Sequence, residues 1–236
     1  MKKLKNMLIG LVATISLTSV AYAGSFGLGV TGSYTKINAS GSETESTVTG
    51  VTTSGEVTSS SVDNNAIIGS IYAEYSFDDA SWGAAGNGIT FGAEYTPGSA
   101  DVSDKIHSRT DVTVNGTEAV QDDGTRTAAA EVDKYRNFYL EIPVYGSIYV
   151  KAGMSQIDVT TKETTTITTS GTYGNKTLDG TNLGIGFKGI TSNNIVWKFA
   201  YEQTDFDTLN LTSTTSNTIK ADLDTKEVAL SIGYRF

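Results

Sequence analysis

The segment Glu227–Phe236 constrains the fold more than any other part of the chain. It reads EVALSIGYRF, in which every second residue from Val228 to Phe236 is apolar and the residues between them are small or charged. Side chains on a β-strand alternate between its two faces. The pattern therefore predicts a strand with one apolar face and one polar face. Such a strand needs an apolar medium on one side only.

Seven further segments alternate in the same way. The eight predicted strands are 25–37, 66–77, 88–96, 134–142, 147–159, 182–190, 195–206 and 225–236. Each is close to the roughly 9–11 residues with which a tilted strand crosses a bilayer. The apolar rows, such as Ile148, Val150 and Ala152 in the fifth segment, would face lipid, and the alternate rows would face the interior.

The connections between these segments are short on one side and long on the other. The short connections are 78–87, 143–146 and 191–194, and the long ones are 38–65, 97–133, 160–181 and 207–224. Two of the long connections contain tracts dominated by Ser and Thr, at 42–61 and 160–172. Such tracts bury little apolar surface and are often disordered. Their β-branched residues equally favour exposed hairpins that prolong the strands.

Together, the strand layout and the aromatic final strand resemble the small OmpA/OmpX-type barrels of bacterial outer membranes. The resemblance implies an all-β fold, an eight-stranded antiparallel transmembrane β-barrel with short periplasmic turns and long extracellular loops. It implies a monomer in the outer membrane, surrounded by outer-membrane lipid and lipopolysaccharide. In that family the terminal aromatic residues look like the signal read by the barrel-assembly machinery, and Tyr234 and Phe236 occupy those positions here.

The first 23 residues have the features of a secretory signal peptide. Lys2, Lys3 and Lys5 precede an apolar stretch, and Ala21 and Ala23 form an A-x-A cleavage site. The alternative, a membrane anchor, needs roughly 20 apolar residues, which this stretch lacks. We expect cleavage after Ala23 and a barrel over residues 24–236.

Composition excludes several classes of site. The chain contains no cysteine, which excludes a disulfide scaffold, a cysteine-ligated metal and a thiol nucleophile. Without the three lysines of the signal peptide, 14 basic residues face 26 acidic ones, a net charge of −12. This acidic balance argues against a nucleic-acid partner, which requires a basic surface. No cofactor is expected.

The inward-facing rows carry charged residues interleaved with glycines. The charged residues are Glu74, Glu94, Glu141, Lys151, Lys188, Lys198, Glu202, Glu227 and Arg235. The interior of an eight-stranded barrel is just wide enough to be filled by side chains, and buried charges are costly unless paired. The favoured interpretation is an ion-pair network that plugs the lumen. The alternative is a narrow ion path lined by the same groups.

Catalytic signals are weak. His107 is the only histidine, with Ser108 beside it and Asp101 and Asp104 nearby. A catalytic role needs a histidine within hydrogen-bond reach of a nucleophile and an orienting carboxylate, and one histidine in a polar connection does not establish that by sequence. Acidic pairs such as Asp205 and Asp207 are surface charges or weak sites for divalent cations that bridge to lipopolysaccharide. We therefore expect a non-enzymatic barrel with a structural, adhesive or surface-interaction role through its long loops and an unknown extracellular partner. A small-solute porin is the alternative.

Overall fold

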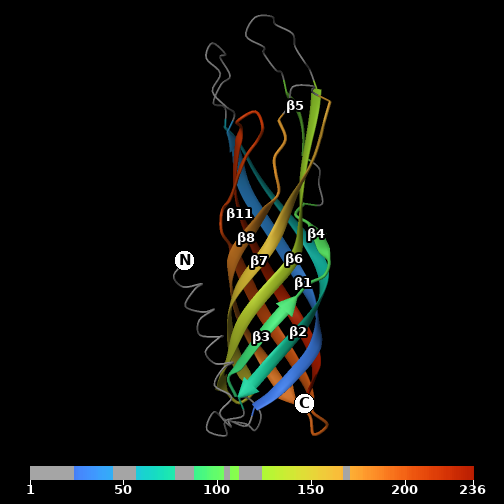
Figure 1. Cartoon of the computed structure of the whole chain (residues 1–236), viewed down its shortest axis with the longest axis vertical. Coiled ribbons are helices and arrows are strands. Elements are labelled where there is room, and N and C mark those ends of the chain that lie inside the picture. The colour runs from blue at the N-terminus through green and yellow to red at the C-terminus, as the bar shows by residue number, and fades with distance from the viewer. Residues whose placement is uncertain (1–23, 45–56, 78–87, 104–106, 112–123, 167–170) are drawn as a thin grey trace, which may run out of the picture.

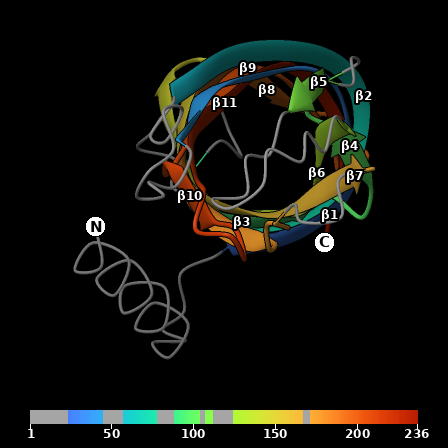
Figure 2. The ribbon, with the colours of Figure 1, turned by 90° about the horizontal axis from the view of Figure 1, so that it is seen from above.

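Eight antiparallel strands form a closed ring (Figure 2). The computed structural model describes residues 24–44, 57–77, 88–103, 107–111, 124–166 and 171–236. The ring strands are β1 (Gly24–Thr44), β2 (Val57–Phe77), β3 (Thr90–Tyr95), β6 (Gly124–Tyr145), β7 (Ile148–Thr165), β8 (Lys176–Ile190), β9 (Ile195–Phe206) and β11 (Thr218–Arg235). They follow one another in this order, and β11 pairs with β1 to close the ring. The predicted eight-stranded antiparallel barrel is confirmed.

Three short strands of the described residues lie beside the ring strands on the side of the long connections, and two of them are labelled in Figure 1. β4 (Ser99–Asp101) and β5 (His107–Asp111) pair with β6, and β10 (Leu209–Thr212) pairs with β11. In the part of the chain that the structure describes, no helix is both long enough and apolar enough to cross a membrane. The predicted signal peptide, residues 1–23, lies outside the described residues and stays a prediction.

Several strands run past the ends that the sequence predicts. β1 and β2 remain paired as far as Thr44 and Val57, although 38–65 is predicted as a connection. β7 continues to Thr165 and β8 begins at Lys176, both inside the predicted connection 160–181. The Ser-, Thr- and Val-rich residues described here thus form exposed hairpins, because β-branched residues suit extended backbone. The tips at 45–56 and 167–170 lie outside the described residues.

β3 is the exception, because it is shorter than predicted. It covers Thr90–Tyr95 rather than 88–96. After Pro97 and Gly98 the chain continues as β4, which pairs with β6 alone. The register of β6 shifts between Asp133 and Arg136, and Lys134 has a φ of 51°. This β-bulge adds a residue to β6 at the level where β3 ends and β4 begins, and bulges bend the strands that carry them.

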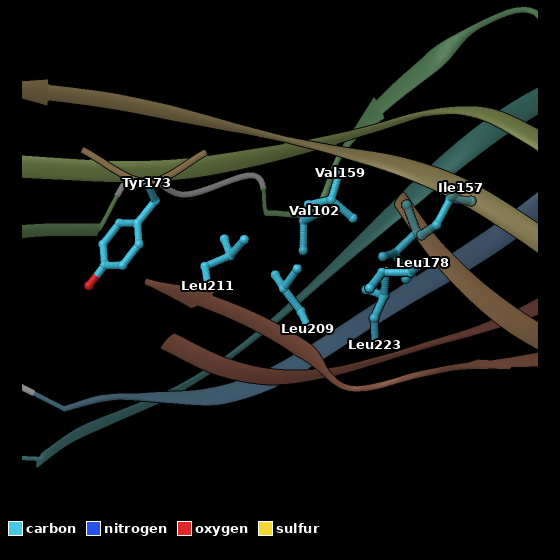
Figure 3. Packing of buried hydrophobic residues seen from close by; sticks show 9 residues of the cluster. Val102, Ile157, Val159, Tyr173, Leu178, Leu209, Leu211 and Leu223 are labelled. Atoms are coloured by element: carbon cyan, nitrogen blue, oxygen red, sulfur yellow. The ribbon is translucent and has the colours of Figure 1, made fainter. Parts of the chain in front are cut away.

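The barrel interior changes character along its length. Toward the short turns it is filled with charged and tyrosine side chains. Toward the long-loop end it holds an apolar cluster (Figure 3), which is made of Ile37, Val102, Ile157, Val159, Tyr173, Leu178, Leu209, Leu211 and Leu223. These residues alternate along their strands with outward-facing polar ones, such as Asp158 beside Ile157. The lumen is therefore polar at one end and apolar at the other.

Candidate functional site

A continuous band of exposed apolar side chains surrounds the ring on the side of the short turns. It includes Leu28, Val30, Ile71, Phe138, Leu183, Ile185, Phe187, Phe199, Leu230 and Ile232. Neighbouring members are cross-strand partners, as Val30 is with Ile71 and Ile232. Soluble proteins rarely expose contiguous apolar patches larger than a few hundred Å². The band therefore faces hydrocarbon, and its rows are those that the sequence predicts.

Aromatic residues gather at the edge of this band nearest the short turns. Tyr234 packs against Phe236 with ring centroids 5.0 Å apart, and Phe236 lies 6.3 Å from Phe26. Tyr75 and Phe77 form another such pair at 5.1 Å. Aromatic girdles around an apolar band, on a closed antiparallel ring with short turns at one end and long loops at the other, define barrels of the bacterial outer membrane. The protein has this architecture, and the membrane surrounds the band.

Four lumenal charges meet in a cluster near the short turns. Lys198 Nζ lies 2.7 Å from Glu141 Oε1 and also pairs with Glu74. Lys188 Nζ lies 2.9 Å from Glu141 Oε2. Each of the four side chains is at most 5% exposed. The cluster joins β2, β6, β8 and β9, so it crosses the full width of the lumen.

A second cluster lies next to the first, on the side of the long loops. Lys151 Nζ lies 2.8 Å from Glu202 and 3.4 Å from Glu94. Ser70 donates a hydrogen bond to Glu94. Asn137 and Asn182 are hydrogen-bonded at 3.3 Å, and Asn182 donates to Thr204 at 3.0 Å. Buried polar groups of this layer thus form hydrogen bonds and ion pairs with one another across the lumen. Such pairing offsets the free-energy cost of removing them from water.

Arg235 and Glu227 flank these two clusters. Arg235 Nη2 donates a hydrogen bond to Ser76 Oγ at 3.1 Å. The same Ser76 hydroxyl is also hydrogen-bonded to the Thr90 hydroxyl at 2.8 Å. Glu227 lies on the other side, where its Oε2 accepts a hydrogen bond from Thr35 at 3.2 Å. The structure therefore places all nine predicted side chains on the lumen side and brings seven of them into ion pairs, Glu74, Glu94, Glu141, Lys151, Lys188, Lys198 and Glu202.

Lumenal tyrosines complete this layer, and the sequence analysis missed them. Lys151 Nζ lies 4.3 Å from the centroid of the Tyr139 ring, and Lys198 Nζ lies 4.8 Å from that of Tyr72. Such cation–π contacts add stabilisation to desolvated cations. A signal was present, because both tyrosines fall between outward-facing apolar residues and so have inward parity.

Glycines make room for these rings. A Cβ at Gly92 would overlap the Tyr139 ring, and a Cβ at Gly29 or Gly233 would overlap Tyr72. A Cβ at Gly186 would likewise overlap the Tyr149 ring. The alternation of glycine and charged residues in the predicted inward rows thus has a steric cause. Each glycine faces a bulky lumenal side chain on another strand.

The part of the barrel beyond the membrane band carries its own charge pairs. Lys162 donates a hydrogen bond to Glu131, which lowers the pKa of that carboxyl and raises the pKa of Lys162. Asp158 accepts a hydrogen bond from Thr177 Oγ1 at 2.7 Å, which lowers the pKa of Asp158, and Lys134 and Arg136 lower it further. These groups are solvent-exposed or nearly so, so they contribute modestly to stability.

The acidic pairs and His107 are the remaining candidates that the sequence offers outside the lumen. Within the described residues, no group of three or more His, Asp or Glu side chains is arranged to hold a metal ion. Asp222 accepts a hydrogen bond from Thr208 at 2.7 Å, and Asp224 accepts one from Asn38 at 2.8 Å. The backbone of His107 lies in β5, but its side chain is outside what the structure describes.

No protein-family model and no curated protein matches this chain. Among solved structures, it is similar to the outer membrane protease OmpT from Escherichia coli, at 8% identity over 90% of this chain and 97% of OmpT, with a TM-score of 0.44. It is also similar to Ail, the attachment invasion locus protein of Yersinia pestis, at 14% identity over 90% of this chain and 97% of Ail, with a TM-score of 0.35. The outer membrane protein AlkL matches at 11% identity over 93% of both chains, with a TM-score of 0.38. Because these identities and TM-scores are low, the fold assignment rests on the closed ring and the apolar band.

Proposed function

We propose that the protein is a non-enzymatic outer-membrane barrel, sealed to ions and polar solutes, that acts at the cell surface through its extended strands. The observation that carries this proposal is the layer of ion pairs across the lumen. Lys198 joins Glu74 on β2 to Glu141 on β6, and Lys151 joins Glu94 on β3 to Glu202 on β9. Side chains from across the ring meet there.

This layer supports a plug over the porin alternative. Paired side chains that are about 5% exposed leave no room for a column of water beside them. A conducting pore needs sites that an ion can enter and leave. Lysines that already share carboxylates with each other, as Lys188 and Lys198 share Glu141, offer no such free site.

The same pairing supports a non-enzymatic role. A general acid or base must have a carboxyl or amine free to exchange a proton with a substrate. Glu141 is instead engaged by two lysines, and Glu202 by Lys151. The described carboxylates of this layer therefore serve the structure of the barrel.

The extended strands supply the surface for external contacts. β1 and β2 remain paired for several residues beyond the apolar band, up to Thr44 and Val57, with Ser, Thr and Asn predominating. A strand ladder holds this polar surface in a defined shape, unlike a disordered loop.

Lipopolysaccharide is the proposed lipid partner. Lys36 and Lys226 are direct cross-strand neighbours and both are exposed. Lys36 lies two residues beyond Tyr34, which is at the edge of the apolar band nearest the long loops. Like charges placed opposite each other on a sheet are destabilising. Phosphate groups of the outer leaflet would relieve this repulsion, in addition to the ion pair of Lys36 with Asp63 at 3.3 Å. β1 and β11 are paired along this seam, so neither offers a free edge there to a second copy, and we expect a monomer.

The seal can be tested with planar bilayers and urea unfolding. We expect the refolded wild-type protein to give no steady single-channel conductance. Lys198→Met leaves Glu74 and Glu141 without a shared cation, and breaking a buried pair typically costs about 3–5 kcal/mol. The urea midpoint of this variant should therefore fall clearly in lipid, without an ion-selective current.

Lys162→Met is the matched control, because Lys162 pairs with Glu131 in an exposed position beyond the membrane. Its midpoint should stay close to that of the wild type. If the wild-type protein conducts, and Lys198→Met keeps its stability but changes ion selectivity, the channel interpretation holds and the plug is refuted.

The surface role is tested separately, by deleting residues 41–60 and measuring cell adhesion. Adhesion should fall while barrel assembly persists, and unchanged adhesion would refute a role for this hairpin.

A further inference from the structure

The wall of the barrel is incomplete between β2 and its neighbour. β3 pairs with β2 only from Ser76 to Ile71, where Ile71 lies opposite Tyr95. Beyond Tyr95 the chain follows β6 as β4, whereas β2 continues with pairing to β1 alone. Higher up, Asn64 Nδ2 donates to the Asp101 carbonyl at 2.8 Å and spans the separation. Among the described residues, the backbone ladder on this side of β2 therefore ends at Ile71, and between Ser70 and Asn64 neither a ladder nor this side-chain bond joins β2 to the neighbouring chain.

A cavity of about 160 Å³ occupies this interruption. Its lining includes Ile37, Ile157 and Leu223 of the lumenal apolar cluster, and also Ile67 and Gly69 on the outward face of β2. The cavity thus reaches from the lumen into the wall. A cavity of about 150 Å³ lined by apolar side chains is large enough for benzene, so this one suits an apolar group of about six to eight non-hydrogen atoms.

The interruption opens at the boundary of the outer leaflet. Its lower edge, Ile71 and Tyr95, belongs to the apolar band. Ile67 is the cross-strand partner of Tyr34, which in turn lies in register with Val228 at the far edge of the band. Ile67 is 89% exposed, the largest exposure among the described apolar residues of the band. An apolar molecule dissolved among the lipid chains therefore meets this opening without crossing water.

The floor of the cavity is acidic. Glu94 and Glu227 both line it, together with Ser70 and Thr35. Glu227 accepts a hydrogen bond from Thr35, and among the described lysines and arginines none forms an ion pair with it. Because Glu94 is already paired with Lys151, the floor presents Glu227 as its main hydrogen-bond acceptor below the apolar walls. A head group that donates hydrogen bonds would be attracted, and an anionic head group would be repelled.

We propose that this cavity binds small amphiphilic amines, with the ammonium head group at Glu227 and the apolar chain between β2 and the lumenal cluster, and that they enter sideways from the outer leaflet. The site lies on the long-loop side of the ion-pair layer and shares only Ser70 and Glu94 with it, at the floor of the cavity. Binding here is therefore independent of whether the lumen conducts ions.

Methyl NMR of the refolded protein in lipid nanodiscs tests the site in the wild-type chain. Hexylamine should shift the methyl signals of Ile68 and Ile157, which line the cavity, in a saturable way. Ile185 and Ile232 face lipid and serve as internal controls for simple partitioning into the bilayer. Hexanoate, with the same chain and the opposite charge, should cause no saturable shift at the cavity methyls.

Two pairs of variants locate the ligand. Ala66→Phe fills the cavity and should abolish the saturable shift, whereas Ala73→Phe on the same strand faces lipid and should leave it unchanged. Glu227→Gln should weaken hexylamine binding about tenfold, because it removes a charge-assisted hydrogen bond. Asp63→Asn, which removes an exposed carboxylate of β2, should not weaken it.

Shifts that do not saturate, or that are equal at Ile68 and Ile185, would overturn the proposal. So would saturable binding of hexanoate with the affinity of hexylamine, or binding that persists in folded Ala66→Phe. Folding of each variant is checked by heat-dependent mobility on gels. If Ala66→Phe does not fold, the comparison of hexylamine with hexanoate on the wild-type protein decides the question alone.

Discussion

Steric fit restricts which residue types are possible at individual lumenal positions, as charge pairing does. Gly92 is opposite Tyr139, and a Cβ at position 92 would overlap the tyrosine ring. Tyr139 in turn lies against Lys151 and Lys198, with ring-centroid distances of 4.3 and 5.6 Å. Small and large side chains thus alternate across the lumen, as a filled eight-stranded barrel requires.

Gly92→Ala should therefore destabilise the barrel. Overpacking of a filled interior typically costs about 1–3 kcal/mol, because the ring has to leave its position beside the lysines. Urea unfolding in lipid measures this loss. Gly32→Ala is the control, because nothing lies within 4 Å of a Cβ at that position. Equal midpoints for the two variants would show that Tyr139 is free to move aside.

Asp158 allows a test of electrostatics outside the membrane. Its hydrogen bond from Thr177 holds its pKa below the ordinary value, which is about 3.9 in an unfolded chain. The carboxylate therefore stabilises the fold above that pH, and this contribution is lost as the pH falls through the lower, folded-state pKa. Thr177→Val should raise the titration midpoint of Asp158 measured by carboxyl NMR. An unchanged midpoint would assign the shift to Lys134 and Arg136 instead.

At the scale of single elements, each strand crosses the membrane with one face in hydrocarbon. In β11 this face carries Leu230, which is 64% exposed and lies in register with Phe199 of β9. The other face carries Ala229, which is buried in the lumen beside Tyr149 and Ala200. Because side chains alternate with a period of two, one row of each strand faces lipid hydrocarbon and the other row faces the barrel interior.

Leu230→Arg should lower stability by about 2–4 kcal/mol, the range for a cation on the lipid face near the bilayer midplane. The free energy of unfolding in lipid vesicles measures the effect. Ser61→Arg provides the control, since Ser61 is exposed on β2 beyond the membrane band. A Leu230→Arg variant as stable as Ser61→Arg would mean that the faces of β11 have been assigned backwards.

For the whole molecule, closure of the ring depends on the pairing of its first and last strands. β1 and β11 pair over 18 positions, from Gly27 with Arg235 to Thr44 with Thr218. The Phe236 amide donates to the Phe26 carbonyl at 2.8 Å, and their rings are in contact. Phe236 thus extends the seam that closes the barrel.

Deleting Phe236 should impair assembly, because it removes this last seam contact and the aromatic group proposed as the assembly signal. We expect protease-sensitive protein in the periplasm, measured by cell fractionation. Phe187→Ala, which removes another outward aromatic residue of the band, should still reach the membrane. A deletion variant that assembles at the wild-type level would remove Phe236 from the assembly signal.

The faces of the strands could be predicted from the residues alone, since alternation with a period of two places Leu230 outward and Lys198 inward whatever the neighbouring strand is. The number of ring strands could be predicted as well, from eight alternating segments of membrane-spanning length. The meeting of Lys198 with Glu74 and Glu141 could not be predicted from this alternation, because the stagger between strands sets which lumenal residues share a level. The interrupted wall beside β2 accompanies a β-bulge in β6 and the pairing of β4 with β6 alone. Both are properties of pairing between strands, so the alternation within a single strand does not predict them.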